Sequence, residues 1–214
     1  MPAFGHYYVD VADKIKDILD EYPAGAATLR EILQNTDDAG GTIQRFILDT
    51  RDDPVSGELV DDTLQRCNGP AILAVNNSTL SESDWKAITR ISKSSKKEDE
   101  RSTGKYGQGF CTVYHVTDNP HVLSGRKLLI LDPNEFVNGS TGLIWPSSNG
   151  SSTEYDRKKY PGHMRGFDCV PDVHDDDYHG TAIRLPLRQS DSHSRIKSTP
   201  TSTEDVDSMF DNFI

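Results

Sequence analysis

One stretch constrains the fold of this chain more than any other: the run from Leu29 to Gly40. In a helix at about 100° per residue, Glu31, Asn35 and Asp38 would fall on one narrow arc, because they stand at positions i, i+4 and i+7. No Lys or Arg stands at that spacing to pair with the two carboxylates. Such a stripe suits a nucleotide, since it offers a base for water, an oxygen ligand for magnesium and an acceptor near the helix end. A solvated polar face is the alternative.

The apolar residues of the same helix predict a layer of helix on sheet. They are expected on the side opposite the polar stripe: Ala26, Leu29, Ile32 and Leu33. The helix should run over 26–39, because Gly40 and Gly41 follow and glycine enters the left-handed region at little cost.

Hydrophobic periodicity divides the rest of the chain into short helices and strands, as is typical of one α/β domain. Further helices are predicted over 9–22, 84–91 and 203–213, and the last should face inward with Val206, Met209, Phe210 and Phe213. Strands are predicted over 43–48, 71–75, 121–124, 127–131, 143–145, 166–170 and 180–187. The polar segments 51–68 and 189–202 are predicted to be a loop and a linker.

Charge and cysteine content limit the possible partners and compartment. The formal net charge of −11 argues against a nucleic acid or an anionic membrane surface as partner. No long apolar run indicates a signal peptide or a membrane span. The three cysteines, Cys67, Cys111 and Cys169, form neither a disulfide framework nor a zinc pattern. We therefore expect a protein of a reducing compartment, the cytoplasm, with the nucleus left open.

Two adjoining segments in the middle of the chain have unusual compositions. Residues 92–102 contain no apolar residue, which predicts an exposed segment, either a plain linker or a part with a purpose. Gly104, Gly107 and Gly109 then precede a predicted helix that begins near Phe110. Free backbone N–H groups at such a helix start can hold phosphate. The spacing is that of neither a dinucleotide fingerprint nor a P-loop, so a simple glycine turn is the alternative.

Taken in order, these parts resemble the GHKL superfamily of ATP-binding domains, which includes the heat-shock protein 90 chaperones, and within it most of all the sacsin-type domain. Several motifs carry the likeness: Leu29 to Gly40, Gly69-Pro-Ala, Asp84-Trp85, Gly104 to Phe110, Val113 to Asp118, Leu129 to Pro133 and Gly180 to Leu187. The likeness spans residues 8–188 and leaves 189–214 as a polar linker and a short C-terminal helix. It implies a two-layer α/β sandwich with a mixed, mostly antiparallel sheet and helices on one face.

The resemblance also implies two ligands, ATP and Mg²⁺, and roles for particular residues. Glu31 would be the general base that polarises the attacking water, Asn35 would ligate the magnesium, and Asp38 would lie by the base and sugar. Thr181 would help to hold the adenine, and residues 92–103 would form the ATP lid, which has to move and so cannot be packed. The phosphates would be held by the glycine-rich stretch: Gly104, Gly107, Gln108, Gly109 and Phe110.

The chain departs from the heat-shock proteins where they bind adenine with the aspartate of an Asp-x-Gly-x-Gly turn. Here the matching stretch begins with Asn76 and Asn77 and has neither a carboxylate nor a glycine. An amide oxygen is a weaker acceptor than a carboxylate by about 1 kcal/mol, or about tenfold in affinity. We therefore expect weak nucleotide binding and slow hydrolysis in a chaperone-related protein that acts on a protein client or with a co-chaperone. The alternative is a non-hydrolysing module that serves as an interaction platform.

Overall fold

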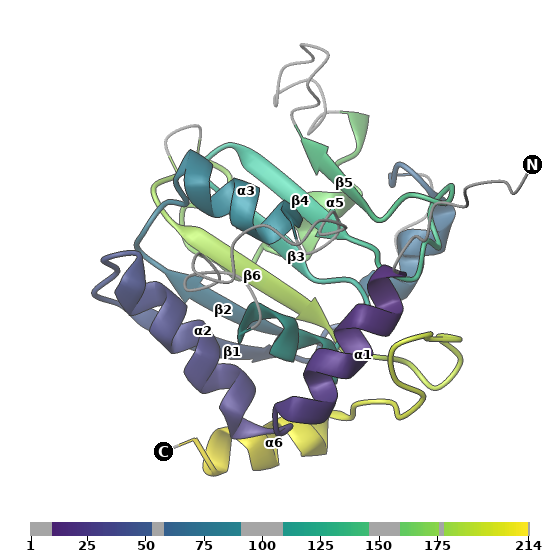
Figure 1. Ribbon diagram of the computed structural model, residues 1–214. Coiled ribbons are helices and arrows are strands. Elements are labelled where there is room, and N and C mark those ends of the chain that lie inside the picture. Colours follow the sequence, from purple (N-terminus) through teal and green to yellow (C-terminus); the bar gives the residue numbers. More distant parts are fainter. Residues whose placement is uncertain (1–9, 53–57, 91–108, 146–158, 176–177, 214) are drawn as a thin grey trace, which may run out of the picture.

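A six-stranded antiparallel sheet forms the centre of the molecule (Figure 1). The computed structural model describes residues 10–52, 58–90, 109–145, 159–175 and 178–213. In the order β1-β2-β6-β3-β4-β5, the sheet contains β1 Gln44–Asp49, β2 Ala71–Asn76, β3 His121–Ser124, β4 Lys127–Leu131, β5 Gly142–Trp145 and β6 Thr181–Pro186. Each of these strands lies within about one residue of a predicted strand at either end.

Every pairing between these described strands is antiparallel, so the sheet is not mixed as expected. The reason is the position of β6. Because β2 and β3 both pair antiparallel with β6, they run in the same direction. The chain passes between them through α3, Glu82–Arg90, and η2, a 3-10 helix at Gly109–His115. Such a crossover commonly joins two parallel neighbours, and here the late strand β6 lies between them.

One face of the sheet carries most of the helices, among them α1 Val11–Glu21, α2 Ala26–Asp38 and α6 Thr203–Asp211. Figure 1 shows α1, α2 and α3 in front of the strands. Their buried side chains share one hydrophobic core with the strands, which includes Ile15, Leu29, Ile32, Trp85, Phe110, Val206, Ile72, Val122 and Ile183. None of the helices in the described ranges is long and apolar enough to cross a membrane.

The opposite face is covered by a short helix and turns, which corrects two expectations. Helix α5, Gly162–Arg165, adds a helix to the face that was expected to have none, and the strand predicted over 166–170 is absent. That segment continues as turns, with Phe167 N–H bonded to Met164 O and Val170 N–H to Phe167 O, both at 2.8 Å. Phe167 and Val170 are buried in the core of this face at a spacing of i, i+3, which favours a helical turn over a strand.

The predicted loop over 51–68 contains a second short helix, η1 Asp62–Cys67. Its N-terminal cap is Asp61, whose side chain accepts a hydrogen bond from the Thr63 N–H at 2.9 Å. Leu64 and Cys67 are buried on one side of it, against Ile130 of β4. The charged composition concealed these two inward positions, because they are separated by polar residues.

Helix α2 is rotated relative to the expected orientation, so Leu33 does not lie against the sheet. Leu33 is 41% exposed, while Leu29 and Ile32 are buried. Two threonines complete the buried side, because their hydroxyls find partners there. Thr28 Oγ1 donates to Thr112 O at 3.2 Å, and Thr36 Oγ1 donates to Gln44 Oε1 at 2.6 Å. The polar stripe therefore borders the buried side and is only half exposed.

Three histidines are buried in the fold without a carboxylate partner among the described residues. Burial lowers the pKa of His115 and holds that of His121 well below its usual range. Burial also lowers the pKa of His163 to about 4, and its Nε2 accepts a hydrogen bond from Val60 N–H at 3.0 Å. All three are therefore neutral in the folded protein near neutral pH.

The rotation of α2 can be tested with two neighbouring substitutions. Ile32→Ala should lower the free energy of unfolding by about 2 to 5 kcal/mol, because it leaves a cavity in the core. Leu33→Ala should change it by less than about 0.5 kcal/mol, because that side chain lies outside the hydrophobic core. Urea unfolding followed by circular dichroism measures both. An equal loss for the two variants would contradict this orientation.

The buried histidines should make stability fall in mild acid. The unfolded chain takes up protons near pH 6.5, whereas folded His163 resists protonation until about pH 4. Stability is therefore complete above pH 6.5 and falls as the pH drops toward 4, by about 1.4 kcal/mol per pH unit for each such proton. The variant His163→Gln, which keeps an acceptor for Val60, should show a shallower dependence of unfolding free energy on pH. An unchanged slope would contradict the assignment.

Candidate functional site

Helix α2 and η2 meet at a contact between Glu31 and Gly109. A Cβ atom built on Gly109 would overlap Glu31 Oε2 and would lie 3.1 Å from Glu31 Cδ. The Glu31 carboxylate therefore occupies the space that any other residue at 109 would fill. Two residues that the sequence analysis placed in one site, from separate motifs, are thus direct neighbours.

The rest of η2 is fixed against α2 by packing and one hydrogen bond. Phe110 is 1% exposed and belongs to the core, so it anchors the helix rather than facing solvent. One turn further, Thr112 O accepts the hydrogen bond from Thr28 Oγ1. Burial raises the pKa of the Cys111 thiol to about 12, so this cysteine stays protonated and is no nucleophile.

Asn35 and Asp38 follow Glu31 along the half-exposed side of α2. Their spacing places all three side chains on one stripe, as predicted from the sequence. No cluster of three His, Cys, Asp or Glu in the described parts of the chain could hold a metal by itself.

The predicted adenine side of the site lies at the end of β2, where the side-chain oxygen of Asn77 is hydrogen-bonded to two backbone N–H groups. Its Oδ1 accepts hydrogen bonds from the N–H groups of Thr42, at 2.9 Å, and Ile43, at 3.1 Å. Its Nδ2 donates to Thr42 Oγ1 at 2.9 Å. Asn77 thus pins the connection between α2 and β1 to the end of β2, and both acceptor positions of its amide oxygen are used.

Asn76 retains more capacity to bind a ligand. Its Nδ2 donates to Thr36 Oγ1 at 3.0 Å, and its Oδ1 accepts one hydrogen bond, from Ser78 N–H at 2.9 Å. One acceptor position of the amide oxygen is left. The side chain is largely buried, with 9% of the residue exposed. Of the two asparagines, Asn76 is therefore the one whose amide oxygen could receive a further donor.

Thr181 is buried next to the turn that follows β2, at residues 77–80, and makes hydrogen bonds that hold this turn in place. Its hydroxyl donates to Ser78 O at 2.7 Å and lies 2.8 Å from Ser124 Oγ, which in turn accepts from Leu80 N–H. Thr181 is opposite Asn76 on β2 and opposite Ser124 on β3. Thr181 therefore holds the backbone that follows β2 in place.

The preceding glycine allows this arrangement. A Cβ on Gly180 would lie 2.7 Å from Asn76 O, so a larger residue would push the two strands apart. Thr36, Ser78 and Ser124 also belong to this network and were not predicted from the sequence. Two of them could have been predicted to make hydrogen bonds, because buried hydroxyls need partners. Ser124 ends a strand just before a glycine turn, and Thr36 lies on the buried side of a helix.

The structure thus joins the predicted residues into two groups along α2. Glu31 contacts Gly109 near the middle of the helix. At the C-terminal end of the helix, Asn76 is hydrogen-bonded to Thr36. Thr181 is hydrogen-bonded to Ser78, and the Ser78 Oγ donates to Ala39 O at 2.7 Å. The other predicted phosphate-binding residues and the predicted lid lie outside the described residues: Gly104, Gly107, Gln108 and residues 92–103.

Comparison with known proteins gives one family throughout. A family model described as the Sacsin domain matches residues 8–214, which include α6 and the segment before it. Human sacsin is 34% identical to this chain in an alignment 216 positions long, which covers 94% of the chain. It covers 5% of the human protein, so the chain spans only a small part of that relative's length.

The close contact at Gly109 can be tested with a single methyl group. Gly109→Ala should displace the Glu31 carboxylate, because the added Cβ would overlap Oε2. The loss of stability should stay within about 1 kcal/mol, since the end of a flexible side chain can rotate away. The carboxyl ¹³C resonance of Glu31 should shift in this variant and not in Gly69→Ala, where the nearest atom lies 3.4 Å away. An unshifted resonance would refute the contact.

Proposed function

The chain belongs to the Sacsin-domain family, and from this premise we propose that it is an ATP-binding, slowly ATP-hydrolysing module of a chaperone-related protein. The observation that carries the proposal is the contact of Glu31 with Gly109. In this contact Glu31, the proposed general base, lies beside Gly109, the first residue of η2 and one of the glycines proposed to bind phosphate. A carboxylate that lies against the backbone of a second helix is poorly explained by a merely solvated helix face.

The chemistry assigned to the chain's own residues is limited. Glu31 would accept a proton from the attacking water through its carboxylate, which lies against Gly109. Asn35 would offer its amide oxygen to magnesium, and Asp38 would accept a hydrogen bond near the sugar. Magnesium, when bound, neutralises phosphate charge.

The end of β2 supports the expectation of weak binding. Asn77 Oδ1 already accepts two hydrogen bonds, so Asn76 would be the acceptor for the adenine amino group. A buried neutral amide with one remaining acceptor position gives a weaker hydrogen bond than a carboxylate. Thr181 would contribute through the turn that it holds.

The hydrogen bonds of Asn77 favour a second function, a module that does not hydrolyse ATP and serves as an interaction platform. In that case the end of β2 would have become a structural element, as the bonds of Asn77 to Thr42 and Ile43 suggest. In both cases the partner we propose is a protein client or a co-chaperone rather than a nucleic acid, because the net charge is −11.

Calorimetry with magnesium and ATP, together with phosphate release, separates the two functions. Wild type should bind ATP weakly, and Glu31→Gln should bind it similarly but release phosphate at least about a hundredfold more slowly, because the general base is lost. Glu21→Gln, at an exposed carboxylate at the end of α1, is the matched control and should behave as wild type. Equal phosphate release from Glu31→Gln and wild type would favour the platform, and no detectable ATP binding would refute the first function.

A further inference from the structure

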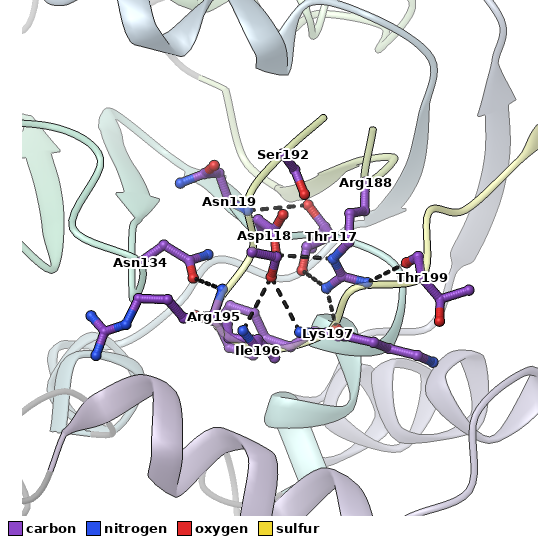
Figure 2. A network of polar contacts seen from close by, with 12 residues as sticks. Thr117, Asp118, Asn119, Asn134, Arg188, Ser192, Arg195, Ile196, Lys197 and Thr199 are labelled. Atoms are coloured by element: carbon purple, nitrogen blue, oxygen red, sulfur yellow. Dashed lines mark hydrogen bonds and ion pairs between the residues drawn. The ribbon is translucent and has the colours of Figure 1, made fainter. Parts of the chain in front are cut away.

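The segment between β6 and α6, residues 189–201, is fastened to the end of η2 by a buried network. We call this segment the strap. Figure 2 shows Arg188, just before the strap, beside Thr117 and Asp118, with Thr199 of the strap on its other side. The Arg188 side chain is 0% exposed, and its Nε donates to Asp118 Oδ1 at 3.0 Å.

Arg188 caps η2 through main-chain oxygens. Its guanidinium donates to Tyr114 O at 2.6 Å, His115 O at 3.1 Å and Thr117 O at 3.0 Å. The last carbonyls of a helix lack partners within it, so this cation satisfies groups that would otherwise be buried unpaired. A further bond, to Thr199 O at 3.5 Å, reaches the strap. One side chain therefore connects η2 with the strap.

Ser194 makes the second connection. Its hydroxyl donates to Asp118 Oδ1 at 2.6 Å and accepts from the N–H groups of Ile196 and Lys197, both at 3.2 Å. Ile196 is buried in the same core as Phe110. Asp118 Oδ2 is buried without a partner in the described part of the protein, so the carboxylate depends on Arg188 and Ser194.

Beyond the strap, α6 reaches the other element of the candidate site. Phe210 and Phe213 pack against Phe46 of β1, with ring centroids 6.4 and 5.4 Å away. Arg30, the neighbour of Glu31 on α2, donates to Asn212 O at 3.5 Å. The strap therefore contacts the end of η2, and the helix that follows the strap contacts α2; η2 and α2 are the two elements that form the contact between Gly109 and Glu31.

We propose that Ser194, Asp118 and Arg188 are positioning residues, through which the strap holds η2 against α2 in the arrangement that binds nucleotide. The coupling to nucleotide rests on the proposed function. A loosened η2 would spend less time in the binding arrangement, and the apparent dissociation constant rises as that fraction falls. The coupling is reciprocal, so nucleotide would in turn tighten the strap.

The test uses the full chain and three substitutions. Ser194→Val removes the hydroxyl, whereas Ser194→Thr keeps the hydroxyl in a side chain of nearly the same shape as valine. Ser198→Val, at an exposed position of the strap, is the control for a changed side chain alone. Hydrogen exchange without nucleotide reports on η2 through the amides of Val116 and Thr117, which bond to Val113 O.

In Ser194→Val these two amides should exchange about tenfold faster, the change expected for one lost hydrogen bond to a charged group, while the amides of β2 stay unchanged. Calorimetry should show a magnesium–ATP dissociation constant raised by a similar factor. Ser194→Thr and Ser198→Val should match wild type in both measurements.

Three results would overturn the proposal: unchanged η2 exchange in Ser194→Val, equal acceleration over the whole sheet, or faster η2 exchange with unchanged ATP affinity. A wild type that binds no ATP would instead refute the proposed function. In that case the exchange measurement alone decides whether the strap positions η2.

Discussion

The pairing of β6 with both β2 and β3 is the constraint on which the rest of the structure depends. At its first residue, Thr181, this strand supports the turn after β2. Just past its end, Arg188 satisfies the carbonyls that close η2. These two polar networks therefore lie at opposite ends of one ladder of backbone hydrogen bonds, and a shift of β6 would disturb both together.

Periodicity in the sequence was sufficient to predict most elements because most of them bury a simple pattern of side chains. Strands such as β2 are continuous apolar runs, and α1 repeats its apolar residues at helical spacing. The segment 166–170 was wrongly predicted to be a strand because it is short, and its buried residues Phe167 and Val170 follow a spacing of i, i+3 and not strand alternation. Leu33 misled because two threonines, which composition counts as polar, occupy the buried side of α2 with bonded hydroxyls.

The sequence was sufficient to name residues of the candidate site but not to predict which of them are in contact. Glu31 and Gly109 could be named from motifs, yet their direct contact depends on how α2 and η2 pack. The bonds of Asn77 and Arg188 run mostly to main-chain atoms, which every residue carries, so no pattern of side chains announces them. For the same reason the strap read as a linker of polar composition.

The unequal burial of the three cysteines makes the protein convenient for spectroscopy. Cys67 and Cys111 are buried thiols whose pKa is raised by burial to about 12, whereas Cys169 is exposed, although partial burial raises its pKa as well. A maleimide reagent should thus modify the natural chain at one position. That position lies among the turns that cover the face of the sheet opposite α2. A dye attached there would leave the candidate site unobstructed while still tumbling with the folded domain.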